Sequence, residues 1–220
     1  MVAVDKEAFR EARQALILRR MTALAEAEEH HAAIMAAKRA DAGRDQIEKA
    51  SAWDRGRVVW LGTITEETVR LTMQRLRFLA LQGPEPIKVH INSDGGDVIP
   101  GLMLFDYMRS LGETHRIVTY VAGIAASMAS VIVQAGAHRV MAPDATLMMH
   151  EISTRDAGKI GDLEDHLLWT RATCDRFLDI YAERLKPPYD RQYVKDHWER
   201  KDWFVLADEA LKLGLVDEVR

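Results

Sequence analysis

The stretch Gly123-Ile-Ala-Ala-Ser127-Met-Ala-Ser130 decides how this chain folds. An apolar run, residues 117–122, leads into it, and a helix-compatible segment follows as far as Gly136. The pattern therefore places Ser127 where a strand turns into a helix. At such a turn the helix dipole and free backbone N–H groups can stabilise an oxyanion beside a hydroxyl nucleophile.

A histidine that could act as general base closes the next apolar run, Thr146-Leu-Met-Met-His150. Together with Ser127 it indicates a hydrolase, and in particular a serine protease. The strict Gly-x-Ser-x-Gly elbow is absent, because Ala126 and Met128 flank the serine, and a standard α/β-hydrolase is therefore disfavoured. Spacing alone does not select the acid that would orient the histidine among the 34 acidic residues.

The glycine pair Gly95-Gly96 directly follows a predicted strand, residues 87–91. Glycines there let backbone N–H groups point at a ligand with no Cβ in the way. Neither a Gly-x-Gly-x-x-Gly pattern nor a Lys-Ser/Thr pair follows, so a dinucleotide or phosphate site is disfavoured. Alone the pair would be interpreted as a tight turn, but paired with Ser127 it predicts an oxyanion hole.

From Arg57 onward the sequence alternates between strand and helix patterns, and Thr63 with Glu66 resembles a capping box that opens the first helix. The strands are predicted over residues 58–61, 87–91, 117–122, 138–141 and 146–149. Four helices are predicted. The first runs from Glu66 through Leu79, the second includes residues 102–108, the third covers residues 128–135, and the fourth is long and covers residues 161–185. Crossovers of this length predict an α/β fold with a mainly parallel sheet covered by helices.

The long segment 161–185 carries more apolar side chains than we expect one helix to bury against its own subunit, which predicts an oligomer. These residues are Leu163, Leu167, Leu168, Phe177, Leu178 and Tyr181.

Residues 1–52 differ in character from residues 53–220, and we divide the chain there. The first segment is rich in Ala, Glu and Arg, with apolar residues at helical spacing, and predicts amphipathic helices broken near Gly43. We interpret this N-terminal extension as packing on the body or on a neighbouring subunit rather than on a membrane.

The net charge of −4 and the pI near 6.1 give no electrostatic reason to expect nucleic acid or an anionic membrane. Cys174 is the only cysteine, which excludes an intrachain disulfide and a thiolate metal cluster, and the histidine spacing predicts no metal site. No apolar run approaches the ~20 residues of a spanning helix. Charges spread through the first twenty residues are not typical of a signal peptide, so we expect a cytoplasmic location.

Four motifs resemble those of the ClpP family, the proteolytic subunit of the ATP-dependent Clp protease, over residues 57–220. They are Ile91-Asn-Ser-Asp-Gly-Gly96, Gly123-Ile-Ala-Ala-Ser-Met128, Leu147-Met-Met-His150 and, near the end, Gly214-Leu-Val-Asp217. Their order and spacing are compatible with the family. The resemblance implies the ClpP/crotonase-like superhelix and an endopeptidase that cleaves unfolded or extended polypeptides inside a ring-shaped chamber.

Carried over position by position, the resemblance implies Ser127 as nucleophile, His150 as base, and backbone N–H groups of Gly96 and Met128 as oxyanion hole. It also implies Asp202 as the third residue, ahead of Trp203-Phe-Val-Leu-Ala-Asp-Glu-Ala210. Segment 161–185 would be the handle helix that joins two seven-subunit rings. The chain itself would need no cofactor, because only a partner Clp-type ATPase would use ATP.

Three departures from the family pattern leave alternatives open. Asp94 replaces the motif proline, Arg200-Lys201 stands where many relatives carry an acid–arginine pair that couples the rings, and residues 1–50 do not resemble an axial loop. A phage- or prophage-type maturation protease that works without an ATPase is one alternative. A catalytically weak ring scaffold is another. A crotonase-type acyl-CoA enzyme is disfavoured by the Ser127/His150 pairing.

Overall fold

The structure is a computed structural model that describes residues 56–220. The N-terminal extension predicted for residues 1–52, with its boundary, lies outside the described residues. The strands are β1 Val58–Leu61, β2 Ile87–Ser93, β3 Ile117–Ala126, β4 His138–Met141, β5 Thr146–Met149, β6 Trp203–Leu206 and β7 Glu218–Val219. The helices are α2 Glu66–Gln82, α3 Val98–Leu111, α4 Met128–Val133, α5 Ile160–Ala182, α6 Arg191–Trp198 and α7 Ala207–Leu213.

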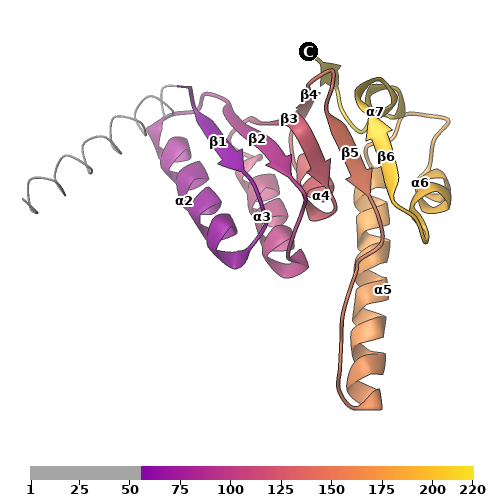
Figure 1. The fold of residues 1–220 in the computed structure, drawn as a ribbon. Coiled ribbons are helices and arrows are strands. Elements are labelled where there is room, and N and C mark those ends of the chain that lie inside the picture. Colours follow the sequence, from indigo (N-terminus) through magenta and orange to yellow (C-terminus); the bar gives the residue numbers. More distant parts are fainter. Residues whose placement is uncertain (1–55) are drawn as a thin grey trace, which may run out of the picture. The chain divides into compact units, whose positions relative to one another are not determined.

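The predicted α/β architecture, a mainly parallel sheet flanked by helices, is confirmed (Figure 1). Strands follow the order β1-β2-β3-β4-β7, and β5 pairs with both β3 and β6. Each pair is parallel except β5–β6, which is antiparallel. None of the helices between residues 56 and 220 is both long and apolar enough to cross a membrane.

Strand β3 lies at the centre of the sheet and is longer than the predicted 117–122. Its first half pairs with β4 and its second half with β5, so β3 serves two branches of the sheet. Between the halves lies Gly123, at φ 82°, where a Cβ would sit 2.8 Å from the side-chain oxygen of Asn92. That same oxygen accepts a hydrogen bond from the N–H of Ile124. Because the strand continues to Ala126, Ser127 follows it directly.

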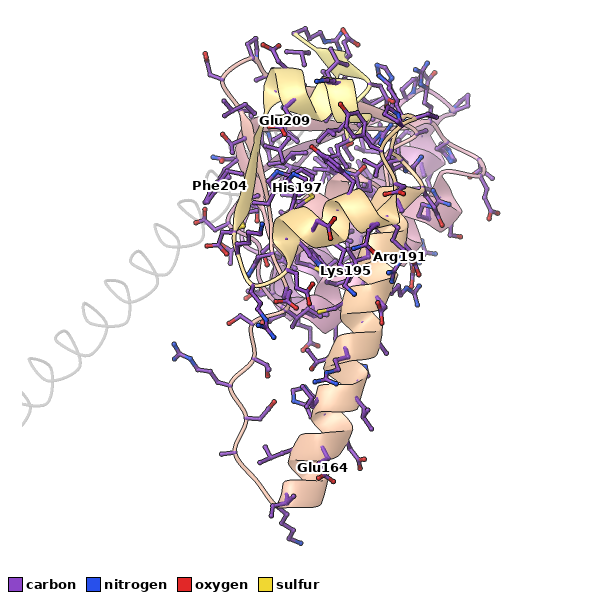
Figure 2. The ribbon with its side chains drawn as sticks, turned by 90° about the vertical axis from the view of Figure 1, so that its right-hand side faces the viewer. Glu164, Arg191, Lys195, His197, Phe204 and Glu209 are labelled. Carbon is purple, nitrogen blue, oxygen red and sulfur yellow. The ribbon has the colours of Figure 1, made fainter. Side chains whose placement is uncertain are left out.

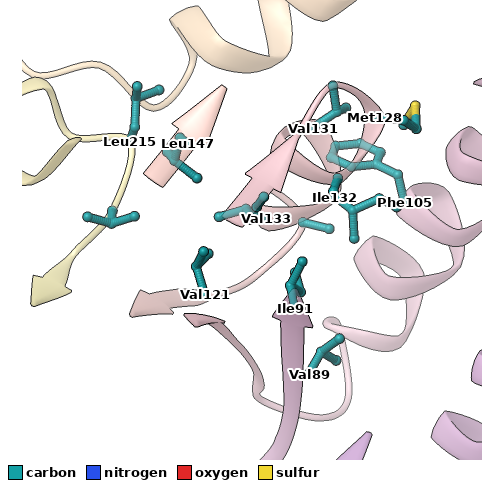
Figure 3. Close-up of a cluster of buried hydrophobic side chains, with 14 of the residues drawn as sticks. Val89, Ile91, Phe105, Val121, Met128, Val131, Ile132, Val133, Leu147 and Leu215 are labelled. Atoms are coloured by element: carbon teal, nitrogen blue, oxygen red, sulfur yellow. The ribbon is translucent and has the colours of Figure 1, made fainter. Parts of the chain in front are cut away.

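The core lies between the sheet and the helices that cover it. In β2 every second side chain points into it, so that Val89 and Ile91 are fully buried. Helix α4 is buried along its whole length, and Ile132 and Val133 lie on the side that faces the β2 and β3 side chains (Figure 3). Complete burial of α4 anchors the helix whose first residue follows Ser127.

Helix α5 extends away from the sheet (Figure 1). Its second half is fixed to the body, where Arg191 of α6 donates hydrogen bonds to Asp175 and Asp179. Figure 2 shows Glu164 near the free end of α5, far from that attachment. The helix ends at Ala182 rather than at the predicted residue 185.

The predicted capping box is wrong in its residues but right in its place. The N-cap of α2 is Thr65, whose hydroxyl accepts the N–H of Thr68, and the Thr68 hydroxyl accepts the N–H of Thr65. Two threonines, Thr65 and Thr68, thus make the reciprocal hydrogen bonds that were predicted for Thr63 and Glu66.

Candidate active site

Ser127 is held in a strained conformation at the junction of β3 and α4. Its φ of 55° and ψ of −126° lie where non-glycine residues are rarely found, which costs on the order of 1–3 kcal/mol. Surrounding hydrogen bonds impose it: the Ser127 N–H donates to the Met148 carbonyl at 2.8 Å, and the Ser127 carbonyl accepts the Ser130 N–H at 3.0 Å. Such a sharp strand-to-helix turn presents a side-chain hydroxyl clear of its own backbone.

The Gly95-Gly96 turn fits tightly against this serine. A Cβ on Gly95 would lie 2.7 Å from the Ser127 Cβ, and one on Gly96 would lie 2.1 Å from the Ile64 carbonyl oxygen. Ile64 fixes the turn on both sides, since its N–H donates to the Gly95 carbonyl and its carbonyl accepts the Asp97 N–H, each at 2.9 Å. Only glycine, at φ 100° and 146°, allows this approach.

Two residues that line the cavity beside the serine have backbone amides without a protein acceptor in the described part of the chain. Within residues 56–220, neither the Gly96 N–H nor the Met128 N–H donates a hydrogen bond to another protein group. Both residues line the same cavity as Ser127. The N–H of Met128 also stands at the N-terminus of α4, where unsatisfied amides favour negative charge. The two amides can therefore receive an oxyanion formed next to the Ser127 hydroxyl.

His150 and Asp202 are brought together by the register of β5 and β6. The antiparallel pairing sets Met149 opposite Trp203, which makes His150 and Asp202 the next facing positions. Their Nδ1 and Oδ1 atoms are 3.9 Å apart. The His150 side chain is 23% exposed and that of Asp202 is 60% exposed, so this carboxylate lies at the surface.

A short turn before β6 positions Asp202. Arg200 adopts φ 59°, and its N–H donates to the Glu151 carboxylate at 2.9 Å. Glu151 is the neighbour of His150 in the chain, so the turn that carries Asp202 is joined to the strand end that carries His150. These four residues, His150, Glu151, Arg200 and Asp202, line an open hollow together with Lys201.

The cavity beside Ser127 is lined by both polar and apolar groups and has a volume of about 170 Å³. Ser127, His150, Gly96 and Met128 lie on it, and Asp202 stands behind His150 without reaching it. The remaining lining residues are Val98, Val131, Ile152, Ser153, Phe177 and Tyr181. The arrangement can hold an apolar side chain next to a hydroxyl, an imidazole and two free amides.

Sequence reasoning did not predict that α5 forms part of this cavity. Phe177, Leu178 and Tyr181 were counted among the apolar residues of segment 161–185 that exceed what one subunit can bury, but they are 4%, 3% and 1% exposed within their own subunit. The exposed members of that set are Leu163, Leu167 and Leu168. The helical spacing of the three buried residues was a correct signal of a buried face, but it did not identify what the face is buried against.

Burial also decides the state of the two remaining candidate nucleophiles on α5. It raises the pKa of the Cys174 thiol, which therefore stays protonated and unreactive at neutral pH. It likewise raises the pKa of the Tyr181 hydroxyl, despite the hydrogen bond to Ser130 that acts in the opposite direction. Tyr181 is thus a hydrogen-bond donor at any working pH.

Comparison with known proteins agrees with this geometry. The family model described as Clp protease matches residues 41–220. The ATP-dependent Clp protease proteolytic subunit of Deinococcus radiodurans is 32% identical over 167 residues, which are 74% of this chain and 79% of that protein.

Proposed function

This chain belongs to the Clp protease family, and from that premise we propose that it is a serine endopeptidase whose catalytic triad is Ser127, His150 and Asp202. One observation carries the proposal. Ser127 occupies a strained turn on a cavity that it shares with His150 and with the free amides of Gly96 and Met128. This is the set of groups that acyl transfer requires.

In the proposed reaction the Ser127 hydroxyl attacks the carbonyl carbon of a peptide bond. Nδ1 of His150 faces Asp202, which leaves Nε2 to take the hydroxyl proton. The Gly96 and Met128 amides stabilise the negative oxygen of the tetrahedral intermediate. His150 then returns the proton to the leaving amine, and a water molecule hydrolyses the acyl-enzyme with the same imidazole as base. These side chains, backbone amides and water suffice, so we propose no cofactor for this chain.

The proposed substrate is an unfolded or extended polypeptide, bound by strand addition. The residue before the scissile bond would place its side chain in the cavity, against the apolar side chains of Val98, Val131 and Phe177. A volume of about 170 Å³ lined mainly by hydrocarbon favours a large apolar side chain there over a charged one.

We further propose that the chain assembles into rings that enclose the site, with the exposed half of α5 as the handle between rings. A Clp-type ATPase is the proposed partner that would consume ATP and deliver substrate. A maturation protease that acts without this partner remains the alternative, to be separated by the response to an unfoldase. A catalytically weak ring scaffold is the second alternative. The observation in its favour is that Asp202 is exposed and its oxygen lies beyond hydrogen-bond reach of His150.

Labelling with a fluorophosphonate probe tests the proposal. We expect the wild-type protein to be labelled at Ser127, and Ser127→Ala to abolish both labelling and hydrolysis of a fluorogenic peptide. Ser110→Ala, on the exposed side of α3, is the matched control and should keep both. A label mapped by mass spectrometry to Ser130 or Ser153 would overturn the assignment. Assembly without any label would favour the scaffold.

A further inference from the structure

A buried chain of hydroxyl groups joins α5 to the turn that carries Ser127. The Tyr181 and Ser130 hydroxyl oxygens are 2.7 Å apart, and the Ser130 hydroxyl donates to the Ser127 carbonyl at 2.6 Å. Ser130 is fully buried and Tyr181 is 1% exposed. These hydrogen-bonded hydroxyls thus lie in the core, and of the two residues only Tyr181 lines the cavity.

Which hydroxyl donates to which follows from the final acceptor, the Ser127 carbonyl. A carbonyl oxygen can only accept, so the single hydroxyl proton of Ser130 is committed to the Ser127 carbonyl. Tyr181 must then donate its own proton to the Ser130 oxygen. Burial raises the pKa of Tyr181, so its hydroxyl keeps the proton that this donation requires. Donation from Tyr181 strengthens the hydrogen bond that Ser130 makes in turn.

The carbonyl that receives this chain belongs to the same planar peptide unit as the N–H of Met128. Whatever fixes the direction of the Ser127 carbonyl therefore fixes the direction of that N–H, at the opposite side of the plane. The Ser130 N–H, at 3.0 Å, supplies one restraint that any residue at position 130 could supply. The Ser130 hydroxyl supplies a second, which depends on the side chain.

We propose that Ser130 and Tyr181 are positioning residues that aim the Met128 amide at the oxyanion. The inference rests on the proposed function, since it concerns the oxyanion hole of that reaction. The proposed role explains why Ser127, which is strained at φ 55°, has a carbonyl that accepts two hydrogen bonds. Strain of this kind persists only where the surroundings over-determine it.

A merely structural reading makes a different prediction. Two buried hydroxyls could simply satisfy one another, in which case their loss would lower stability and leave the chemistry unchanged. Thr119 offers a matched control for that reading. Its hydroxyl is also buried and also donates to a carbonyl of α4, that of Val133, at 3.0 Å, but at the end of the helix remote from Ser127.

The experiment compares Ser130→Ala, Tyr181→Phe, the double variant and Thr119→Val in the full chain. Removing an oxyanion donor costs about 10²–10³ in kcat, and a donor that is misdirected rather than removed should cost about tenfold. We therefore expect Ser130→Ala to lower kcat for peptide hydrolysis about tenfold with KM within twofold. Tyr181→Phe should lower it about threefold, and the double variant should be no worse than Ser130→Ala, because Tyr181 acts through Ser130.

Inhibition by a peptide boronate provides the readout that separates positioning from stability. Its adduct places a negative oxygen in the oxyanion hole, so its affinity should fall by the same factor as kcat/KM. Binding of a non-cleavable peptide should stay unchanged. Thr119→Val should lose thermal stability without losing kcat.

Full kcat in a folded Ser130→Ala variant would overturn the inference while leaving the proposed function intact. If Ser130→Ala does not fold, Tyr181→Phe, which keeps the ring in the cavity wall, decides the question alone. A wild-type protein that neither cleaves peptides nor reacts with the probe overturns the proposed function and this inference together.

Discussion

His150 and Asp202 face each other just beyond the last residue pair of β5 and β6, with Nδ1 and Oδ1 3.9 Å apart. This separation exceeds the reach of a hydrogen bond, although both residues are held by the same pair of strands. Hydrogen bonds between catalytic groups are often long in the absence of substrate and shorten in the reacting complex.

Asp202→Asn should severely impair hydrolysis. The amide cannot stabilise the imidazolium of His150, and loss of the equivalent carboxylate in other serine proteases lowers kcat by about 10⁴. Asp144→Asn and Asp208→Asn, both exposed acids on neighbouring segments, should retain wild-type kcat. The measurement is steady-state peptide hydrolysis with active-site titration. An Asp202→Asn variant that keeps more than about a tenth of wild-type turnover would exclude Asp202 from the proposed triad.

The exposed half of α5 should join subunits, and more weakly than is usual for paired rings. Its exposed apolar side chains are Ile160, Leu163, Leu167, Leu168 and Trp169. Next to Asp202 the turn carries two basic residues, Arg200-Lys201, in place of an acid–arginine pair. Native mass spectrometry should therefore show one ring in exchange with two.

Leu168→Glu tests which surface makes that contact. Leu168 is 65% exposed, and a charge there should shift the population to single rings. Leu81→Glu places the same charge on a side chain that is 79% exposed at the end of α2, and should leave the distribution unchanged. A stable wild-type monomer at micromolar concentration would contradict the oligomer altogether.

The elements nearest to the site could be predicted closely from the sequence. Strands β1, β4 and β5 begin and end at the predicted residues. Strands β1 and β5 are short runs rich in apolar residues. Strand β3 was predicted too short because Gly123 was interpreted as its end. The glycine instead accommodates Asn92 within a continuing strand, which is a tertiary contact that local pattern does not carry.

The third acid illustrates where bottom-up reasoning from sequence ended. Spacing could not choose Asp202 among 34 acidic residues, and only a resemblance indicated it. In the structure this proposed acid lies near His150 because β5 and β6 pair in antiparallel register, although they are separated by more than fifty residues in the chain. The Ser130–Tyr181 contact is long-range in the same way, and no sequence signal distinguished that serine from an ordinary packing residue.

Deleting residues 1–50 should raise peptidase activity and separate the two protease alternatives. The helices predicted there, outside the described residues, would cover or narrow the entrance of a ring or brace neighbouring subunits. Peptide hydrolysis by full-length and truncated protein should be compared, each with and without a bacterial Clp unfoldase and ATP. We expect low activity in the full-length protein and no response to the unfoldase. Strong ATP-dependent stimulation of the full-length protein would instead support the ordinary Clp partnership.

Acid should destabilise the fold through Asp217, which anchors the C-terminal strand β7. Arg139 is 6% exposed and donates to the Asp217 carboxylate from its backbone N–H at 2.8 Å and from Nε at 3.0 Å. Burial raises the pKa of Asp217, but the hydrogen bonds and charge of Arg139 outweigh it, and the pKa is lowered overall. A carboxylate with a lowered folded-state pKa stabilises the protein above its unfolded value, about 3.9, and loses that contribution as pH falls through the folded value.

Asp217→Asn should therefore flatten the acid side of the stability profile. Urea denaturation from pH 7 to pH 3 should show the wild-type free energy of unfolding falling below about pH 4, and the variant should fall less over that range. At pH 7 the variant should be less stable by about 1.5–3 kcal/mol, because the buried Arg139 loses a charged acceptor. Asp144→Asn, at an exposed turn, should reproduce the wild-type profile. Parallel profiles for wild type and Asp217→Asn would show that the Arg139 pair does not control the acid response.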